Sequence, residues 1–340
     1  MLEKYKIRRY PGLRPRVVVI GGGTGLSVLL RGLKEYTPNI TAIVTVADDG
    51  GNSGDLREDL GILPPGDIRD CLLALANTEP SMEKLFNYRF DDGKLKGQNI
   101  GNLLIAAMNN MYGSFEKAVK EMSNVLAVTG RVLPMTLSNV SLCAVLENGR
   151  LVRGESKIPR EALASESPIE KVYVEPEILQ PLEDAIDAIL AADLIVLGPG
   201  SLYTSVIPNL LVDRIVDSIK ESQGVKVYIA NVMTQPGETD NYSLYGHVDA
   251  ILRHSRDDIL DYVIANLEDI PDQLLESYAE DGAQQVRIER EDLLDLEKKD
   301  INFIGQDLID IKDGLIRHDS KVLSRILISI AGMTMKVKKL

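Results

Sequence analysis

The chain has 340 residues, of which 44% are hydrophobic and none is Trp, so it suits one large or two ordinary domains with an aliphatic core. Its formal net charge of −13 argues against sequence-independent binding to nucleic acid, which requires a basic surface. Two distant cysteines, the absence of a long apolar run and the absence of a visible signal peptide favour a cytoplasmic protein with reduced thiols.

Both ends of the chain are basic. Residues 1–16 form an arm with six Lys or Arg against one Glu, and residues 333–340 form a short basic tail. Two interpretations of the arm are open: a solvated segment, or a segment that makes weak contact with an anionic membrane surface.

The first third of the chain alternates between predicted strands and helices. Val17–Ile20 is a short apolar strand, and leucines at i, i+3, i+4 and i+7 from Leu26 mark one face of a helix. A buried strand at 40–46 and a helix at 68–76 follow. Such alternation predicts a parallel sheet with helices on both faces.

The middle of the chain changes character. Asn148-Gly149 joins two β-like runs at 140–146 and 151–153, which is a strong hairpin signal. A further strand at 172–174 extends this patch. Residues 139–175 are therefore predicted to form a small antiparallel β insertion within one α/β domain at 17–332.

Alternation resumes after the insertion. The predicted elements are helices at 184–191 and 210–220, strands at 194–197 and 225–230, a helix opening at 255–258, a late strand at 285–290 and a last helix after 318–320.

The first of four polar turns at predicted strand ends is Gly21-Gly22-Gly23-Thr24-Gly25. Free amides at a helix start favour a phosphate, and glycine lets the backbone approach it. The glycine spacing does not complete the dinucleotide fingerprint, and no Lys follows as a Walker motif requires. Gly22, Gly23, Thr24 and Gly25 are candidate phosphate-binding residues, and a plain tight turn is the alternative.

The second turn is acidic. Asp48 and Asp49 follow the second strand, and Asn52 and Ser53 come next. A carboxylate about 4 Å from a phosphate oxygen would cost about 4 kcal/mol at an effective dielectric of 20. These acids therefore bind sugar hydroxyls, or they hold a divalent cation such as Mg²⁺ against the phosphates. A solvated acidic loop is the alternative.

The third and fourth turns add neutral and hydroxyl groups. Asp67, Asn99 and Asn102 lie beside glycines, although Asp67 and Asn102 also suit helix caps. The fourth turn, Gly198-Pro199-Gly200-Ser201, has the same pattern as the first: an apolar strand, a glycine turn, hydroxyl side chains and then a helix. Asn231 ends the neighbouring strand. In open α/β sheets ligands bind at the carboxyl ends of strands, so one composite pocket is predicted. Its further candidate residues are Gly198, Gly200, Ser201 and Asn231.

Residues typical of acid–base catalysis are scarce. The three histidines, His247, His254 and His318, form no triad or metal pattern, and no G-x-S-x-G motif occurs. Any chemistry would depend on carboxylates and a metal.

Six motifs in order, GGGTG, ADDGGNSG, PPGDIRD, GQNIGN, LGPGSLYTSVIPNLL and NVMTQPGETD, resemble the gluconeogenesis factor family. This family is a CofD-like branch of the superfamily named for 2-phospho-L-lactate transferase, and the resemblance spans about 17–330. It implies a Rossmann-like three-layer fold with a mainly parallel sheet, often in a homodimer. The transferase branch moves a phosphate-linked group from a nucleotide diphosphate onto a deazaflavin with a divalent metal.

The branch that this chain resembles most implies binding of UDP-sugars, notably UDP-N-acetylglucosamine. It also implies a requirement for cell shape and wall (peptidoglycan) synthesis on gluconeogenic carbon sources. A late Tyr and Arg that contact the nucleotide sugar match Tyr278 and Arg317.

We therefore expect a UDP-sugar-binding regulatory protein rather than an enzyme, with an unidentified protein partner. The alternative is a metal-dependent transferase that acts on a nucleotide diphosphate-linked substrate, with Mg²⁺ held by Asp48 and Asp49. A nicotinamide-dependent dehydrogenase is a weaker third alternative, because the third glycine of the fingerprint is missing.

Overall fold

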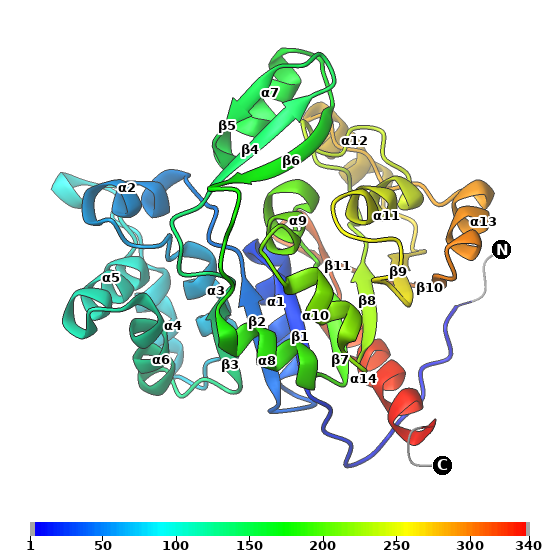
Figure 1. Ribbon diagram of the computed structural model, residues 1–340, viewed down its shortest axis with the longest axis horizontal. Coiled ribbons are helices and arrows are strands. Elements are labelled where there is room, and N and C mark those ends of the chain that lie inside the picture. The colour runs from blue at the N-terminus through cyan, green and yellow to red at the C-terminus, as the bar shows by residue number, and fades with distance from the viewer. Residues whose placement is uncertain (1–3, 338–340) are drawn as a thin grey trace.

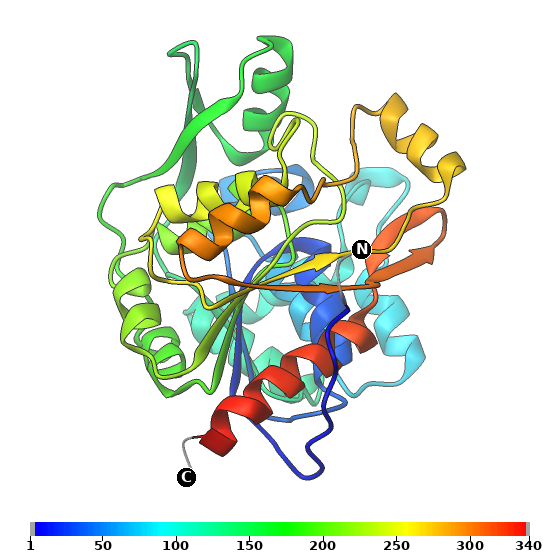
Figure 2. The ribbon, with the colours of Figure 1, turned by 90° about the vertical axis from the view of Figure 1, so that its right-hand side faces the viewer.

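A seven-stranded parallel sheet forms the centre of the protein, in a computed structural model that describes residues 4–337 (Figures 1 and 2). The strand order is β10-β9-β8-β7-β1-β2-β3, and every neighbouring pair is parallel. The order reverses at β1, which lies between β2 and β7. The strands are β1 Val17–Gly21, β2 Ile40–Val44, β3 Arg131–Pro134, β7 Leu194–Leu197, β8 Val225–Ile229, β9 Tyr262–Asn266 and β10 Asn302–Gln306.

Helices cover both faces of this sheet, as the Rossmann-like prediction requires. α1, α3 and α14 pack together on one face, and α8 and α10 pack together on the other. The helices are α1 Gly23–Leu33, α2 Gly51–Leu60, α3 Gly66–Leu75, α4 Pro80–Asn87, α5 Ile100–Tyr112, α6 Phe115–Val125, α7 Ile158–Ala164, α8 Glu183–Ala191, α9 Ile207–Leu210, α10 Ile215–Glu221, α11 Leu244–Arg253, α12 Asp272–Glu280, α13 Arg290–Lys298 and α14 Ser320–Val337. Short turns η1 Gly93–Leu95, η2 Glu155–Lys157 and η3 Leu202–Val206 complete the set.

The predicted antiparallel insertion is confirmed. β4 (Ser141–Leu146) pairs with β5 (Leu151–Arg153) and β6 (Ile169–Glu175) in a three-stranded sheet. Figure 1 shows it at the top, together with α7, above the carboxyl ends of the main strands. A second small sheet, the hairpin of β11 (Ile309–Lys312) and β12 (Leu315–His318), leads into α14.

Three local predictions are wrong. The chain after Ser255 forms a turn and then β9, not a helix. The single helix predicted at 210–220 is interrupted at Arg214, whose φ of 64° is left-handed, so α9 and α10 are separate. The late strand at 285–290 is reduced to isolated bridges, and α13 begins at its end.

The backbone of the basic arm is docked on the domain over residues 4–16, while its Lys and Arg side chains are exposed to solvent. The Tyr5 N–H donates to the Gly305 carbonyl at 3.1 Å, and the Arg8 N–H donates to the Ser329 hydroxyl at 2.9 Å. The arm therefore crosses α14 (Figure 2). Residues 1–3 of the predicted arm and 338–340 of the predicted tail lie outside the described residues, and 333–337 continue α14.

Close packing of α1 on the start of α14 depends on Gly32. A Cβ at this position would lie 2.5 Å from the Ser320 carbonyl oxygen and 2.6 Å from the Ser324 hydroxyl oxygen. Glycine in a helix interior costs about 1 kcal/mol relative to Ala. The close packing of α1 and α14 that Gly32 allows offsets this loss of helix propensity. Over residues 4–337, none of the helices combines the length and the apolarity needed to cross a bilayer.

Candidate functional site

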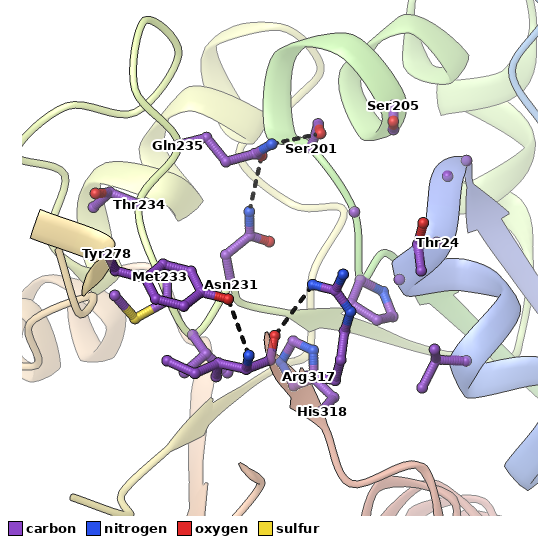
Figure 3. Close-up of a pocket in the computed structure, with 18 residues that line it drawn as sticks. Thr24, Ser201, Ser205, Asn231, Met233, Thr234, Gln235, Tyr278, Arg317 and His318 are labelled. Carbon is purple, nitrogen blue, oxygen red and sulfur yellow. Dashed lines mark hydrogen bonds between the residues drawn. The ribbon is translucent and has the colours of Figure 1, made fainter. Parts of the chain in front are cut away.

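A pocket of about 330 Å³ opens at the carboxyl ends of β1, β7 and β8, where the strand order reverses (Figure 3). Ligands of open α/β sheets bind at such a switch point. Nine of its lining residues are among those predicted from the sequence: Gly22, Gly23, Thr24, Gly25, Gly200, Ser201, Asn231, Tyr278 and Arg317.

Two glycine turns face each other across the base of the pocket. A Cβ at Gly25 would lie 2.7 Å from the Pro199 carbonyl oxygen, and a Cβ at Gly200 would lie 3.0 Å from the Gly22 carbonyl oxygen. Any larger residue at Gly25 would have to separate the two backbones. Gly198 lies beneath the pocket, where its φ of 76° turns the chain and its N–H donates to the Ile20 carbonyl.

The start of α1 is open to the pocket only in part. Gly22 is its N-cap and has no side chain to satisfy the first amides. The Gly23 N–H is already bound by the Asp67 carboxylate, which lies outside the lining. The remaining first-turn amides, those of Thr24 and Gly25, have no partner within the helix and are the donors that α1 offers a ligand.

The second helix start is closed. The buried Glu238 carboxylate accepts from the Tyr203 N–H at 3.2 Å and from the Thr204 hydroxyl at 3.0 Å. Burial raises the pKa of Glu238 to about 7. The fourth turn thus contributes Gly200 and Ser201 to the pocket, but not the amides that begin η3.

Arg317 supplies the positive charge of the pocket. It stands on β12, and Figure 3 shows its guanidinium between Asn231 and Thr24. One of its N–H groups donates to the Ile316 carbonyl at 3.2 Å, and no carboxylate in the described chain lies within ion-pair distance. The described lining contains neither Asp nor Glu, so no carboxylate of the lining would repel a bound anion.

Tyr278 holds the strand that carries Arg317. Its hydroxyl accepts the Ile316 N–H at 2.9 Å, and its ring packs in a small apolar cluster with Val232 and Ile270. The hydroxyl keeps its own proton to donate. Tyr278 therefore both lines the pocket and positions the neighbouring Arg317.

Side-chain amides and a hydroxyl close the side opposite α1. The Asn231 side-chain amide donates to the Gln235 side-chain oxygen Oε1 at 3.4 Å, and the Gln235 side-chain amide donates to the Ser201 hydroxyl at 2.8 Å. This chain of contacts ties the end of β8 to the turn after β7. The Asn231 carboxamide oxygen has no such role and is an acceptor available to a ligand.

The sequence did not single out four polar lining residues, Ser205, Thr234, Gln235 and His318. Ser205 could have been found from its spacing, because it lies one helical turn after Ser201 in the sequence. The structure shows that turn, since the Ser205 N–H donates to the Ser201 carbonyl. His318 gives no such signal. Burial lowers the pKa of His318 to about 4, and its Nε2 contacts the Ala230 carbonyl at 3.1 Å, so it is neutral at pH 7.

The acidic residues lie outside the lining, on the α2 and α3 side of Gly22. The Asp48 carboxylate accepts the Gly50 N–H, and the Asp49 carboxylate accepts the Ser156 N–H, each at 2.9 Å. Burial raises the pKa of Asp67 to about 7 and that of Glu155 to about 8, and the charges of Asp48 and Asp49 add to the latter shift.

Asp48 and Asp49 each use one carboxylate oxygen, Oδ1, for a contact with a backbone N–H. Over residues 4–337 no group of three His, Cys, Asp or Glu side chains is placed to hold a metal ion. Binding of Mg²⁺ by this pair stays a prediction.

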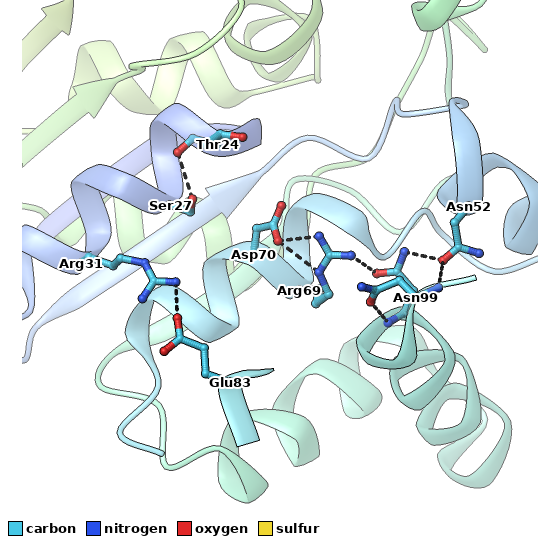
Figure 4. A network of polar contacts seen from close by, with 9 residues as sticks. Thr24, Ser27, Arg31, Asn52, Arg69, Asp70, Glu83 and Asn99 are labelled. Atoms are coloured by element: carbon cyan, nitrogen blue, oxygen red, sulfur yellow. Dashed lines mark hydrogen bonds and ion pairs between the residues drawn. The ribbon is translucent and has the colours of Figure 1, made fainter. Parts of the chain in front are cut away.

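Three of the four predicted asparagines, Asn52, Asn99 and Asn102, form a network at the start of α5 rather than part of the pocket (Figure 4). The Asn99 side chain accepts the Asn102 N–H at the start of α5, and Asn52 accepts from the Asn99 N–H and from the Asn102 side chain. All three are buried, and Ser53 is buried against Gly66. The side-chain oxygens of all three asparagines accept hydrogen bonds within the protein, and the contact of these residues and Ser53 with a ligand stays a prediction.

The comparisons agree with this architecture. Residues 17–309 match the family of 2-phospho-L-lactate transferase CofD. A protein of Thermoanaerobacterium thermosulfurigenes is 56% identical, with 93% of this chain and 97% of the relative covered. The gluconeogenesis factor of Bacillus subtilis is 47% identical, with 94% and 99% covered.

The crystal structure of a UPF0052 family member from Bacillus halodurans is similar, with a TM-score of 0.89, 45% identity, and 93% of this chain and 100% of that chain covered. The same family is indicated by the order of the motifs, by the strand topology and by the sequence identity over most of the chain. The chain belongs to the 2-phospho-L-lactate transferase CofD family, together with relatives named gluconeogenesis factor.

Proposed function

We propose that this protein binds a UDP-sugar, of the UDP-N-acetylglucosamine type, and regulates cell shape and wall synthesis during gluconeogenic growth. The observation that carries the proposal is Arg317, an unpaired guanidinium in a pocket whose described lining has no carboxylate. The names of the relatives support the gluconeogenic part of the proposal.

The pocket offers distinct groups to the two ends of such a ligand. Thr24 and Gly25 present amides to the diphosphate, and Arg317 presents a fork of N–H donors that matches phosphate oxygens. Asn231 offers an amide to a base or sugar edge. At about 330 Å³ the cavity is at the small end of ligand pockets, which span about 300–1,000 Å³, so part of the ligand stays in solvent.

A binding role is favoured over catalysis because the lining has no acid–base pair. Its one histidine has a pKa of about 4 and no carboxylate beside it in the pocket. The ligand would instead act by occupancy, and the protein partner that responds to it is unidentified.

Calorimetry with UDP-N-acetylglucosamine tests the proposal. Arg317→Ala should weaken binding about 10- to 150-fold, since hydrogen bonds to a charged group contribute about 1.5–3 kcal/mol. Arg287→Ala is the matched control, because this exposed arginine lies in the neighbouring groove beside α12. No binding by the parent protein at millimolar ligand, or equal losses in both variants, would contradict the proposal.

A second candidate is a transferase, favoured by the family match and by Asp67, a carboxyl with a raised pKa directly behind Gly22. At pH near 7 such a group exchanges protons readily, which suits general acid–base work. Chromatography of a UDP-sugar incubated with the protein, with and without Mg²⁺, would detect turnover. An unchanged ligand after hours in both mixtures would exclude transfer to water, the form of this activity that needs no added acceptor.

A further inference from the structure

A second cavity of about 560 Å³ lies at the other end of α1 from the pocket, between the basic arm and α14. Arm residues 7–13 form one wall, and Glu35 and Tyr36, which follow α1, form another. Arg325 and Ile328 of α14 complete it.

The arm is held in place without any charged side chain of the cavity. Its path turns at Tyr10–Leu13, where the Leu13 N–H donates to the Tyr10 carbonyl at 3.2 Å and Gly12 has a φ of 77°. The Tyr10 ring lies against Gly332, where a Cβ would overlap it. The wall therefore exists before any ligand binds.

Three arginines line this cavity against a single carboxylate, Glu35. Arg8 and Arg9 come from the arm, and Arg325 comes from α14. In the described part of the chain none of the three takes part in an ion pair, and Arg325 uses one N–H for the Lys321 carbonyl at 3.3 Å. Their remaining N–H groups are exposed and available.

This charge stands out in a chain of net charge −13. Guanidinium groups bind phosphate oxygens through paired N–H donors, and clustering three of them repels cations and favours a multiply charged anion. Tyr36 and Leu13 supply adjoining surface that an organic group could contact.

We propose that this arm cavity is a second binding site, for a phosphate compound that carries at least two negative charges. The site is formed by the arm and α14 together, and it is separate from the pocket at Arg317. A free phosphate compound and a lipid headgroup share this chemistry.

The test uses the full chain in an Arg317→Ala background, so that the pocket contributes little. Calorimetry with inorganic pyrophosphate and flotation with phosphatidylglycerol vesicles are the two assays. Arg8→Ala/Arg9→Ala is compared with Lys6→Ala/Arg14→Ala, which removes the same charge from arm residues outside the cavity. Arg325→Ala probes the opposite wall without touching the arm, and circular dichroism checks folding.

Arg8→Ala/Arg9→Ala and Arg325→Ala should each weaken binding of one probe by about tenfold or more, and the control pair by less than about threefold. A loss seen with pyrophosphate assigns the site to a free phosphate compound, and a loss confined to vesicles assigns it to lipid. Equal losses in the two double variants, or no binding of either probe, would overturn the proposal. UDP-sugar binding by the parent protein is measured separately, so failure here leaves the proposed function standing.

Discussion

Asp67→Asn should stabilise the protein at pH 8, because the native fold surrounds this carboxyl with groups that penalise its charge. Desolvation raises its pKa from 3.8 to about 7, and the Asp48 and Asp70 charges act in the same direction. Asparagine retains an oxygen to accept the Gly23 N–H but carries no charge. A shift of about three units corresponds to about 4 kcal/mol of unfolding free energy.

The sign follows from proton binding. Between pH 3.8 and 7 the folded state holds a proton on Asp67 that the unfolded state has released, so stability falls as pH rises through this range. The full penalty of about 4 kcal/mol applies at pH 8, and only about 1.6 kcal/mol applies at pH 5. The gain from Asp67→Asn should therefore be larger at pH 8 than at pH 5.

Urea unfolding followed by circular dichroism at the two pH values measures this difference. Asp59→Asn is the matched control, since it removes the same charge from an exposed residue of α2. A variant that is no more stable than the parent at pH 8, or whose gain is the same at both pH values, would refute the assignment of a neutral Asp67 to the folded state.

Three further predictions test the site. Gly25→Ala should lower the melting temperature in a thermal scan by an amount equivalent to about 1–3 kcal/mol, because its Cβ would overlap the Pro199 carbonyl; an unchanged melting temperature would contradict the close contact of the turns. Asn99→Ala should lose about 0.5–2 kcal/mol in urea unfolding while UDP-sugar affinity is unchanged; a selective loss of affinity would restore its predicted ligand role. Tyr278→Phe leaves the Ile316 N–H unpaired, so urea unfolding should show a loss of about 1–3 kcal/mol, and calorimetry should show weaker UDP-sugar binding because Arg317 is no longer held; full affinity would show that the hydroxyl does not position Arg317.

The first glycine turn and its flanking elements were predictable because their signals are local. An apolar run, successive glycines and leucines at helical spacing lie within Val17–Leu33, and the structure places β1 and α1 there. The partner turn at Gly200 has the same local pattern. That they face each other also followed, since the carboxyl ends of neighbouring parallel strands meet at one edge.

Contacts between distant segments were not predictable in this way. The Asn52 side chain accepts a hydrogen bond from the Asn99 N–H, 47 residues later. This contact holds Asn52 at the start of α5, where Asn99 is the N-cap. An amide that binds a ligand and an amide that caps a helix look the same in sequence. The arm shows the same limit, because Arg8 is held by Ser329 across 321 residues.

The error at 255–263 has a different cause. Ser255 and the acids after it resemble a helix start, and Ile259 and Val263 are four residues apart. The short strand β9 has no periodicity of its own to outweigh them. Its place between β8 and β10 determines its conformation.

The contact of Gly32 with the start of α14 lies outside the pocket but affects the position of the elements that line it. α1 carries the glycine turn at one side of the pocket, and the hairpin that carries Arg317 runs directly into α14. The distance between the Thr24 and Gly25 amides and the Arg317 guanidinium thus depends on how closely the two helices approach at Gly32 and Ser320, as well as on the Tyr278 contact. A larger residue at Gly32 should therefore shift Arg317 relative to the start of α1 while every lining residue stays in place.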